Sequence, residues 1–451
     1  MERNCGKEDG ERGMRLDRRV KYRKYGEYTY LRNTALHREY LMNDTAFDLL
    51  RILSEYPGCT EERLFEELEK QYEAEDEETF RREILEFLRE LEAEKILLGE
   101  PEEENSVQED AAERAQEYCL RHHIVYSACL ELTYRCNERC IHCCVDGGEP
   151  KGELSFSEYK VLLDELARMG CIYLLLTGGE PTLYPEFIRV AEYASGKGFL
   201  VDIYTNGYCL SDELLRRMIA LDPNSISFSF YGGDGESHDA VTGIPGSFEK
   251  SLRAMMICKC AGIDTYIKSI ALRQNLDSLE KLYQLGELLR IPVEMAKSLL
   301  PTGKGRLGEE ELSLQNKEDY MRLLSLEETY RKTLPQRRGR GENLTLCTAG
   351  QSVLSVDPYG NVFPCNSLPI SLGNIREESL GAIWEKAPQI LRERLPAGYL
   401  KTECRECISR EYCQACPGTM ITPEGDFERK DHVCLLAEAA YQYREGKEGI
   451  G

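Results

Sequence analysis

Four cysteines crowd one short segment of the chain, RCNERCIHCC, which runs from Arg135 to Cys144. Cys136, Cys140 and Cys143 are separated by three residues and then by two, and Cys144 follows directly. A zinc site takes four ligands, commonly in two closely spaced pairs, so three thiols in one loop fall short of it. Three thiolates can instead hold three irons of an iron–sulfur cube and leave the fourth iron open to a small chelating molecule. The spacing therefore predicts a cluster with one open iron, and we expect Cys144 to be structural.

The amino-acid composition indicates the cellular compartment in which the protein works and the classes of partner that it can bind. Nineteen cysteines among 451 residues would suggest disulfides in a secreted protein, but the sequence starts with no basic-then-apolar leader. No apolar run approaches the roughly eighteen residues of a membrane span. We therefore expect a cytoplasmic protein with reduced thiols and no membrane partner, in which clustered cysteines are metal ligands. The net charge of −23 argues against nucleic-acid binding, which needs a basic surface.

The elements that must position the cysteine loop lie between residues 126 and 300, where apolar strand-like runs alternate with amphipathic helical segments. The strand candidates are residues 128–133, 172–177, 199–205, 225–231, 264–272 and 293–296. Ser155 and Glu158 form a capping box at the start of the first helix. Six such units predict an α/β fold, a partial (βα)6 TIM-like barrel with a parallel sheet. Chemistry in such folds collects where the strands end, and the cysteine loop directly follows the first strand.

A glycine-rich segment, Gly178-Gly179-Glu180-Pro181, ends the second strand at the same rim. Glycines let the backbone approach a ligand closely, and a carboxylate accepts hydrogen bonds from an ammonium group. Together with the three-then-two cysteine spacing, this segment resembles the radical S-adenosylmethionine (SAM) enzymes, in which the segment contacts the methionine part of SAM.

The resemblance implies a cofactor and a reaction. SAM would chelate the open iron of a [4Fe–4S] cluster, one electron would split its sulfonium, and a 5′-deoxyadenosyl radical would take a hydrogen atom from the substrate. Further SAM contacts implied by the resemblance are His142 in the cysteine loop and the residues that end the third, fourth and fifth strands, Asn206, Ser229 and Lys268. Because the radical comes from the cofactor, no side chain is assigned as catalytic.

Seven more cysteines gather in the C-terminal region, residues 347–451, which has few long periodic segments. Metal binding supplies the stability that such a loop-rich region lacks. The spacing resembles the SPASM extension, although two residues separate Cys413 from Cys416 where the commonest pattern has three. The resemblance implies two auxiliary [4Fe–4S] clusters, and hence three clusters in the chain. One would be held by Cys404, Cys407, Cys413 and Cys434, and the other by Cys347, Cys365 and Cys416.

The set of Cys347, Cys365 and Cys416 is one ligand short of a complete site. A substrate thiolate can fill the gap, and so can a ligand from elsewhere in the chain, such as another cysteine, or water. Asn366 narrows the chemistry further. In the sulfatase-maturing enzymes that the chain resembles, an aspartate at this position accepts a proton, so that reaction is disfavoured here.

Residues 1–98 are expected to form a small, winged-helix-like α+β domain. The segment from Tyr40 to Tyr72 resembles a PqqD-like peptide-recognition domain, in which a leader peptide adds a strand to a sheet edge. A generic winged-helix-like accessory domain is the alternative. Residues 61–117 hold 23 acidic and 7 basic residues, a pattern typical of solvated helix faces followed by an acidic linker, which we place at residues 99–125. Residues 301–346 are expected to bridge the barrel and the SPASM domain.

Together these parts predict an enzyme that modifies a ribosomally made precursor peptide, served by a flavodoxin- or ferredoxin-type electron donor. The incomplete auxiliary set favours a thioether between a peptide cysteine and a carbon of another residue. Carbon–carbon cross-linking, epimerisation and decarboxylation stay open, because fold does not fix outcome. A non-catalytic, zinc-stabilised peptide-binding scaffold is a rival of another class. RNA modification would need a basic groove, and its one candidate, residues 331–341, is interpreted as an exposed loop.

Overall fold

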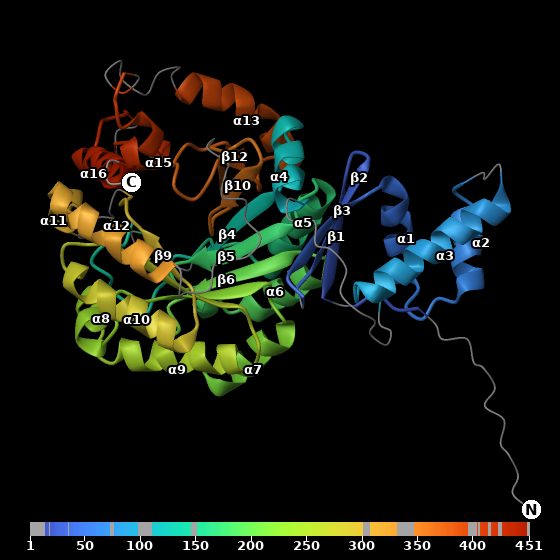
Figure 1. Cartoon of the computed structure of the whole chain (residues 1–451). Helices are drawn as coiled ribbons and strands as arrows, with labels where there is room; N and C mark the ends of the chain where they lie inside the picture. The colour runs from blue at the N-terminus through green and yellow to red at the C-terminus, as the bar shows by residue number, and fades with distance from the viewer. Residues whose placement is uncertain are drawn as a thin grey trace, which may run out of the picture. The chain divides into compact units, whose positions relative to one another are not determined.

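The computed structural model describes residues 14–17, 19–34, 36–72, 76–97, 111–145, 151–300, 307–331, 347–395, 404, 406–413, 416–422 and 426–448. The chain divides into two compact units, residues 1–118 with 339–342 and residues 119–338 with 343–451 (Figure 1). Helix α4 (Ala111–Arg121) contains the boundary between them. The predicted linker at 99–125 and the bridging segment at 301–346 lie partly outside the described residues. The finer domain boundaries given above stay predictions.

The first unit is a three-stranded antiparallel sheet followed by three helices, which is the α+β arrangement predicted for it. Its elements are β1 (Val20–Tyr25), β2 (Tyr28–Asn33), β3 (Arg38–Met42), α1 (Asp44–Glu55), α2 (Glu61–Glu69) and α3 (Glu77–Ala93). Asn43, Thr60 and Asp76 each cap the helix that follows by accepting hydrogen bonds from its first turn. The apolar faces of the three helices and the sheet enclose one core.

The second unit is built on a nine-stranded sheet in the order β12-β11-β10-β4-β5-β6-β7-β8-β9. The six predicted strands are present and parallel, in chain order. They are β4 (Ser127–Thr133), β5 (Tyr173–Gly178), β6 (Leu200–Thr205), β7 (Ser225–Ser229), β8 (Thr265–Ile270) and β9 (Val293–Ala296). Parallel pairing of all six strands, with helices in the connections between them, confirms the predicted partial (βα)6 barrel.

The crossover helices lie on the outer side of this curled sheet (Figure 1). They are α5 (Phe156–Arg168), α6 (Phe187–Gly196), α7 (Asp212–Leu221), α8 (Gly235–Thr242), α9 (Ser247–Cys260) and α10 (Leu279–Leu289), with 3-10 turns at Pro181–Leu183 and Leu276–Ser278. The predicted capping box is present, because Ser155 and Glu158 cap α5 reciprocally. The helices α11 (Glu309–Leu312) and α12 (Lys317–Arg331) follow the barrel.

The C-terminal region extends the barrel sheet, an arrangement that the sequence analysis did not anticipate. Strand β10 (Val353–Val356) pairs in parallel with β4, and β11 (Asn361–Phe363) and β12 (Gly373–Asn374) follow as antiparallel strands. The remaining elements are α13 (Leu380–Arg394), a 3-10 turn at Arg410–Tyr412, α15 (Pro417–Met420) and α16 (Asp431–Glu448). Two long helices, α13 and α16, thus stand in a region predicted to be rich in loops.

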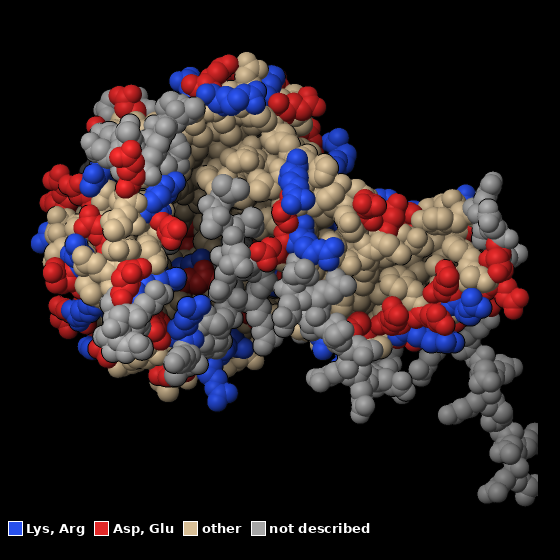
Figure 2. Space-filling view, turned by 45° about the horizontal axis from the view of Figure 1, so that its top comes forward, with Lys and Arg blue, Asp and Glu red and all other residues tan. Residues whose placement is uncertain are grey.

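None of the helices in the described parts of the chain combines the length and the apolar composition that crossing a membrane requires. On the face shown in Figure 2, basic and acidic side chains are interspersed. This distribution differs from the basic surface that nucleic-acid binding would need.

Candidate functional site

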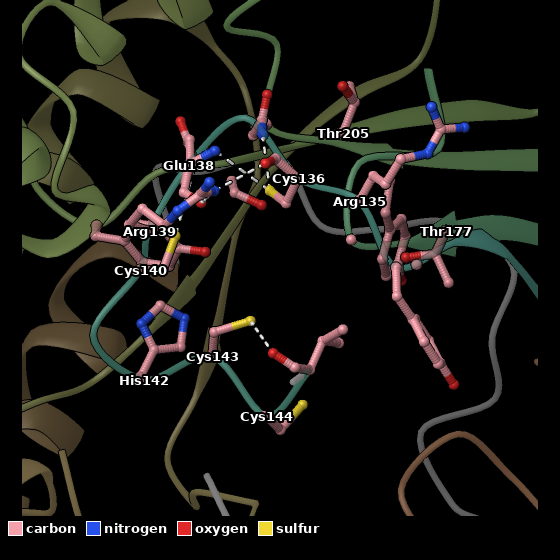
Figure 3. A pocket seen from close by; sticks show the side chains of 18 residues that line it. Arg135, Cys136, Glu138, Arg139, Cys140, His142, Cys143, Cys144, Thr177 and Thr205 are labelled. Atoms are coloured by element: carbon pink, nitrogen blue, oxygen red, sulfur yellow. Dashed lines mark hydrogen bonds between the residues drawn. The ribbon is translucent and has the colours of Figure 1, made fainter. Parts of the chain in front are cut away.

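A cavity of about 550 Å³ lies where β4, β5, β6 and β7 end, and much of its lining comes from the cysteine loop (Figure 3). Parallel strands bring their carboxyl ends to one rim, so the fold gathers here residues that are far apart in the sequence. Eight of the predicted residues line it: Cys136, Cys140, His142, Cys143, Gly178, Gly179, Asn206 and Ser229. Three others, Glu180, Pro181 and Lys268, are not among its lining residues.

Helix α8 fixes the backbone of the cysteine loop. The N–H groups of Arg139 and Ile141 donate to the carbonyl oxygens of Thr242 and Val241, at 2.8 and 3.0 Å. Gly243 then ends the helix with a φ of 71°, and a Cβ atom there would lie 3.3 Å from the Arg139 carbonyl oxygen. The loop therefore occupies a defined place against the barrel before any cofactor binds.

The three spaced thiols are all partly buried at the cavity. Burial raises the pKa of Cys136 to about 11 and raises that of Cys140 well above its ordinary value. Cys136 and Cys143 both act electrostatically on Cys140, and the three side chains can be followed in Figure 3, whereas Cys144 is exposed. Buried thiolates need a nearby cation to offset their desolvation. This donor set fits an iron–sulfur cluster.

Glu138 is a buried carboxyl group inside the cysteine loop that sequence analysis missed, because a glutamate in a loop is usually solvated. Its backbone N–H donates to the Cys136 sulfur at 3.4 Å, and the Cys140 thiol donates to its Oε2 at 3.5 Å. Burial raises the pKa of Glu138 to about 7. In the described part of the chain its Oε1 has no hydrogen-bond partner. Glu138 lines the cavity, and a buried carboxyl oxygen without a hydrogen-bond partner is consistent with a polar ligand bound in that cavity.

The two glycines after β5 allow the strand end to pack against the start of the cysteine loop. A Cβ atom at Gly178 would collide with the carbonyl oxygen of Thr133, and one at Gly179 would lie 2.7 Å from that of Tyr134. The N–H of Gly179 donates to Thr133 at 2.7 Å. Glycine is required at both positions because neighbouring backbone leaves no space for a side chain.

Glu180 is buried and acts within the protein rather than on the cavity. Its Oε1 accepts hydrogen bonds from the N–H of Thr182 at 3.2 Å and the hydroxyl of Thr205 at 2.8 Å, and its Oε2 accepts from the N–H of Asn206 at 2.8 Å. The Asn206 amide in turn donates to Asn137 at 2.6 Å. Glu180 thereby links the ends of β5 and β6 to the cysteine loop. Its predicted contact with SAM stays a prediction.

Lys268 is held behind the cavity wall. Its ammonium group forms an ion pair with Glu294 and lies 4.9 Å from the ring centre of Tyr204, which lines the cavity. Ser229, the residue paired with Lys268 on the neighbouring strand, lines the cavity directly. The predicted contact of Lys268 with SAM stays a prediction.

His142 stands on an aromatic wall that sequence analysis did not detect. Its ring lies edge-on to the ring of Tyr231, with centres 4.6 Å apart. The N–H of Tyr231 donates to Nδ1 of His238 at 3.2 Å, and the two rings stack. Burial lowers the pKa of His238 to about 4, so it accepts this bond as a neutral ring. In the sequence, Tyr231 is simply the last residue of the strand predicted at residues 225–231, so nothing there indicates an aromatic contact with His142.

The electrostatic contacts of the seven C-terminal cysteines follow the two predicted groups, whose assignment as cluster ligands stays a prediction. We call Cys347, Cys365 and Cys416 the sheet set, and Cys404, Cys407, Cys413 and Cys434 the terminal set. Within the sheet set, the charges of Cys347 and Cys416 act on Cys365. Within the terminal set, all three partners act on Cys413, and the set lines a small cavity of about 60 Å³. The Nε–H of Arg429 donates to the Cys434 sulfur at 3.0 Å.

Among the described residues, no group of three or more Cys, His, Asp or Glu side chains converges closely enough to hold a single metal ion. A zinc ion needs four donors at about 2.0 to 2.3 Å. An iron–sulfur cube takes its thiolates at separate corners and therefore accepts sulfur atoms that lie further apart. The zinc-stabilised scaffold stays an alternative.

Three family models match the chain. That of the radical SAM superfamily matches residues 130–286, that of the SPASM iron–sulfur cluster-binding domain matches residues 347–417, and that of coenzyme PQQ synthesis protein D (PqqD) matches residues 35–97. The matched ranges contain the cysteine loop, most of the C-terminal cysteines and most of the first unit.

The proteins similar to this chain include AdoMet-dependent heme synthases and mycofactocin maturases. The AdoMet-dependent heme synthase of Methanosarcina barkeri is 29% identical over 70% of this chain and 96% of its own length. Mycofactocin maturase MftC of Mycobacterium ulcerans is 30% identical over 63% of this chain and 80% of its own length. Among solved structures, Streptococcus suis SuiB bound to S-adenosylmethionine aligns with a TM-score of 0.58 at 14% identity, covering 93% of this chain and 99% of that one. SuiB bound to precursor peptide SuiA gives a TM-score of 0.59 at 13% identity, with the same coverage.

Proposed function

We propose that this chain, which belongs to the radical SAM enzymes with a SPASM domain, modifies a ribosomally made precursor peptide. The observation that carries the proposal is the cavity lined by three partly buried thiols and by the glycine-rich end of β5. The finer reaction that we propose is a thioether bond from a peptide cysteine sulfur to a carbon of another residue. The proposed location is the cytoplasm, because free thiols persist in a reducing compartment.

Each part of the cavity has a proposed role toward the cofactor. Cys136, Cys140 and Cys143 would hold the cluster, and the wall from Gly179 to Asn206 would border SAM. When both are bound, they supply a radical that takes a hydrogen atom from an unactivated carbon. The protein keeps the loop in place through α8 and the end of β5, and burial keeps water away from the thiols.

The first unit supports a peptide as the substrate. Its match to PqqD suggests that a leader peptide adds a strand to the sheet edge while the barrel performs the chemistry. The printed names of two similar proteins agree with this proposal, since MftC is called a maturase and SuiB is described with a precursor peptide. We propose a flavodoxin- or ferredoxin-type protein as the electron donor.

The sheet set supports the choice of a thioether. Cys347, Cys365 and Cys416 provide three thiolates, so one corner of a four-iron cluster there needs a ligand from outside the set. A peptide cysteine that reaches this corner would be held as a thiolate after losing its proton. When its sulfur joins the carbon from which the hydrogen atom has been taken, one electron is released, and it would pass to the auxiliary cluster. We call Cys136, Cys140 and Cys143 the loop set. With one cluster on each of the loop, sheet and terminal sets, the chain would hold three clusters.

The heme synthase relatives favour a second candidate, in which the chain acts on a heme precursor. The supporting observation is the 29% identity to the Methanosarcina barkeri enzyme across almost its whole length. The PqqD-like unit distinguishes the candidates, because a tetrapyrrole offers no strand to add to its sheet. Formation of heme by the purified protein, measured from its absorption spectrum, would favour this second candidate over peptide modification.

The test of the first candidate is mass spectrometry of peptides encoded beside the gene, after anaerobic incubation with protein, SAM and a reductant. A thioether lowers the peptide mass by two hydrogen atoms and protects one cysteine from alkylation. The matched control is Cys143→Ala, which should leave the peptide unmodified. An unchanged mass with inverted chirality would replace the thioether by epimerisation, and no change in any encoded peptide would count against peptide modification.

A further inference from the structure

The sheet set has a neighbour from the first barrel strand. Cys129 lies in the middle of β4, far in sequence from the C-terminal cysteines, and is buried. Its side chain is absent from the main apolar core, which contains its neighbours Ala128 and Leu130. Successive side chains of a strand point to opposite faces, so Cys129 points to the inner face of the barrel sheet.

Strand register places Cys129 and the end of β11 on that same face. Ser355 of β10 pairs with Cys129 of β4 on one side and with Phe363 of β11 on the other. Directly paired residues project to a common face of a sheet, so Phe363 shares the face of Cys129. Cys365 lies two residues beyond Phe363, the last residue of β11, where the chain forms an isolated β-bridge with Leu368. The end of β11 therefore brings Cys365 near the face that carries Cys129.

The two thiols also lie within range of each other's electrostatic effect. The charge of Cys365 acts on Cys129, in addition to the larger effects of burial and of Glu131. Cys365 in turn is acted on by Cys347 and Cys416. By contrast, Cys258, another buried cysteine of the barrel, has burial as the single cause of its raised pKa.

We propose that Cys129 is the fourth protein ligand of the auxiliary cluster held by the sheet set while no peptide is bound. This inference rests on the proposed function, because that function supplies the cluster. If a peptide cysteine takes the same corner, the exchange balances without an oxidant or a reductant. The incoming thiol loses its proton as its sulfur binds iron, and Cys129 gains a proton as it leaves.

The test is the iron content and electron paramagnetic resonance (EPR) spectrum of the anaerobically reconstituted full chain. The background is a chain in which Cys136, Cys140 and Cys143 are replaced by alanine, so that about eight irons of the auxiliary clusters remain. Adding Cys129→Ala should remove between one and four irons and change the EPR spectrum of one cluster. Adding Cys258→Ala, the matched buried control, should change neither. An iron content and spectrum unaltered by Cys129→Ala would overturn the proposal.

A second measurement decides the question if Cys129→Ala fails to fold, as judged by its far-ultraviolet circular dichroism. The second measurement uses Cys129→Ser in the same background, which keeps the size of the side chain and replaces the ligating sulfur by oxygen. A changed EPR spectrum of one cluster supports ligation by Cys129, whereas a spectrum identical to that of the background chain overturns the proposal. Neither measurement uses a peptide, so failure of the proposed peptide modification is detected separately by mass spectrometry.

Discussion

The loop set and the sheet set place three thiols each, but they do so in different ways. Cys136, Cys140 and Cys143 lie within eight consecutive residues, and backbone contacts with α8 and the end of β5 hold them. The thiols of the sheet set come from three separate segments. Pairing of β10 with β4 and β11 positions the segments of Cys347 and Cys365, and close packing of Gly418 against the Ser367 backbone brings the segment of Cys416 to them. A substitution in the cysteine loop should therefore affect the loop cluster and leave the rest of the fold intact. A site built from sheet pairing should respond to changes elsewhere in the fold.

The largest effect should come from removing one thiol of the loop set. In Cys143→Ala, formation of 5′-deoxyadenosine should fall at least about 100-fold, because three thiolates are needed to hold the SAM-binding cluster. The iron content should fall by about four per chain while the auxiliary clusters remain. Cys144→Ala is the control, and it should retain both properties. Undiminished 5′-deoxyadenosine in Cys143→Ala would contradict the cluster assignment.

Gly179→Ala should damage the loop set without removing any ligand. The new Cβ atom would lie 2.7 Å from the Tyr134 carbonyl oxygen, so the strand end and the cysteine loop must separate. We expect a loss of about 1 to 3 kcal/mol in unfolding free energy and partial loss of the loop cluster's iron. Urea unfolding and iron analysis measure the two effects. The control is Gly196→Ala, where nothing lies within 4 Å of the new Cβ atom. This variant should lower neither the unfolding free energy nor the iron content.

Glu180→Gln should weaken SAM binding through Asn206. Both carboxylate oxygens of Glu180 accept hydrogen bonds, and glutamine would present an N–H₂ group to one of these donors. An unsatisfied buried group of this kind costs about 1 to 3 kcal/mol, so we expect SAM affinity to fall by about 10-fold. Equilibrium binding of SAM measures this change in affinity. The control is Glu186→Gln, at a glutamate whose side chain is 36% exposed. Equal affinity in the two variants would show that Glu180 does not position the cavity wall.

The smallest effect concerns the contact between the barrel and the C-terminal region. Arg376, just after β12, donates to Glu158 of α5 at 2.6 Å and lowers the pKa of that carboxyl to about 2. The pair stabilises the fold above the ordinary pKa of glutamate, near 4.5, and its contribution is lost as the pH falls toward 2. Both side chains are at least 35% exposed, so Arg376→Gln should cost only about 0.5 kcal/mol at pH 7.

Urea unfolding of the apoprotein, followed by the fluorescence of Trp384, measures this difference at pH 7 and at pH 3. The difference between the parent and Arg376→Gln should shrink at the lower pH and in high salt. A difference that grows on acidification would show that the ion pair is not its source.

The loop set was predictable from the sequence because its ligands and their spacing are local. The six barrel strands were predictable for a similar reason, since apolar runs of strand length alternate with amphipathic helices. The pairing of β10 with β4 was not, because four residues of apolar sequence carry no information about which edge they join. Cys129 was consequently indistinguishable from any small buried residue of a strand.

Helix α13 escaped prediction for a different reason. Pro388 stands inside it, and proline in a periodic segment normally argues for a helix end. Leu380, Ile383, Trp384 and Ala387 nevertheless bury one face of the helix. Tertiary packing outweighs the local penalty here. Glu138 illustrates the same limit at the site, because only the folded loop shows that this carboxyl group is buried.

The parallel pairing of β10 with β4 also bears on how the polypeptide can be divided. If the chain ended before residue 347, the backbone donors and acceptors along one side of β4 would lose their partners. An exposed strand edge of this length invites association with other molecules. A fragment ending at the last barrel strand would therefore tend to aggregate, although it contains every cysteine of the loop set.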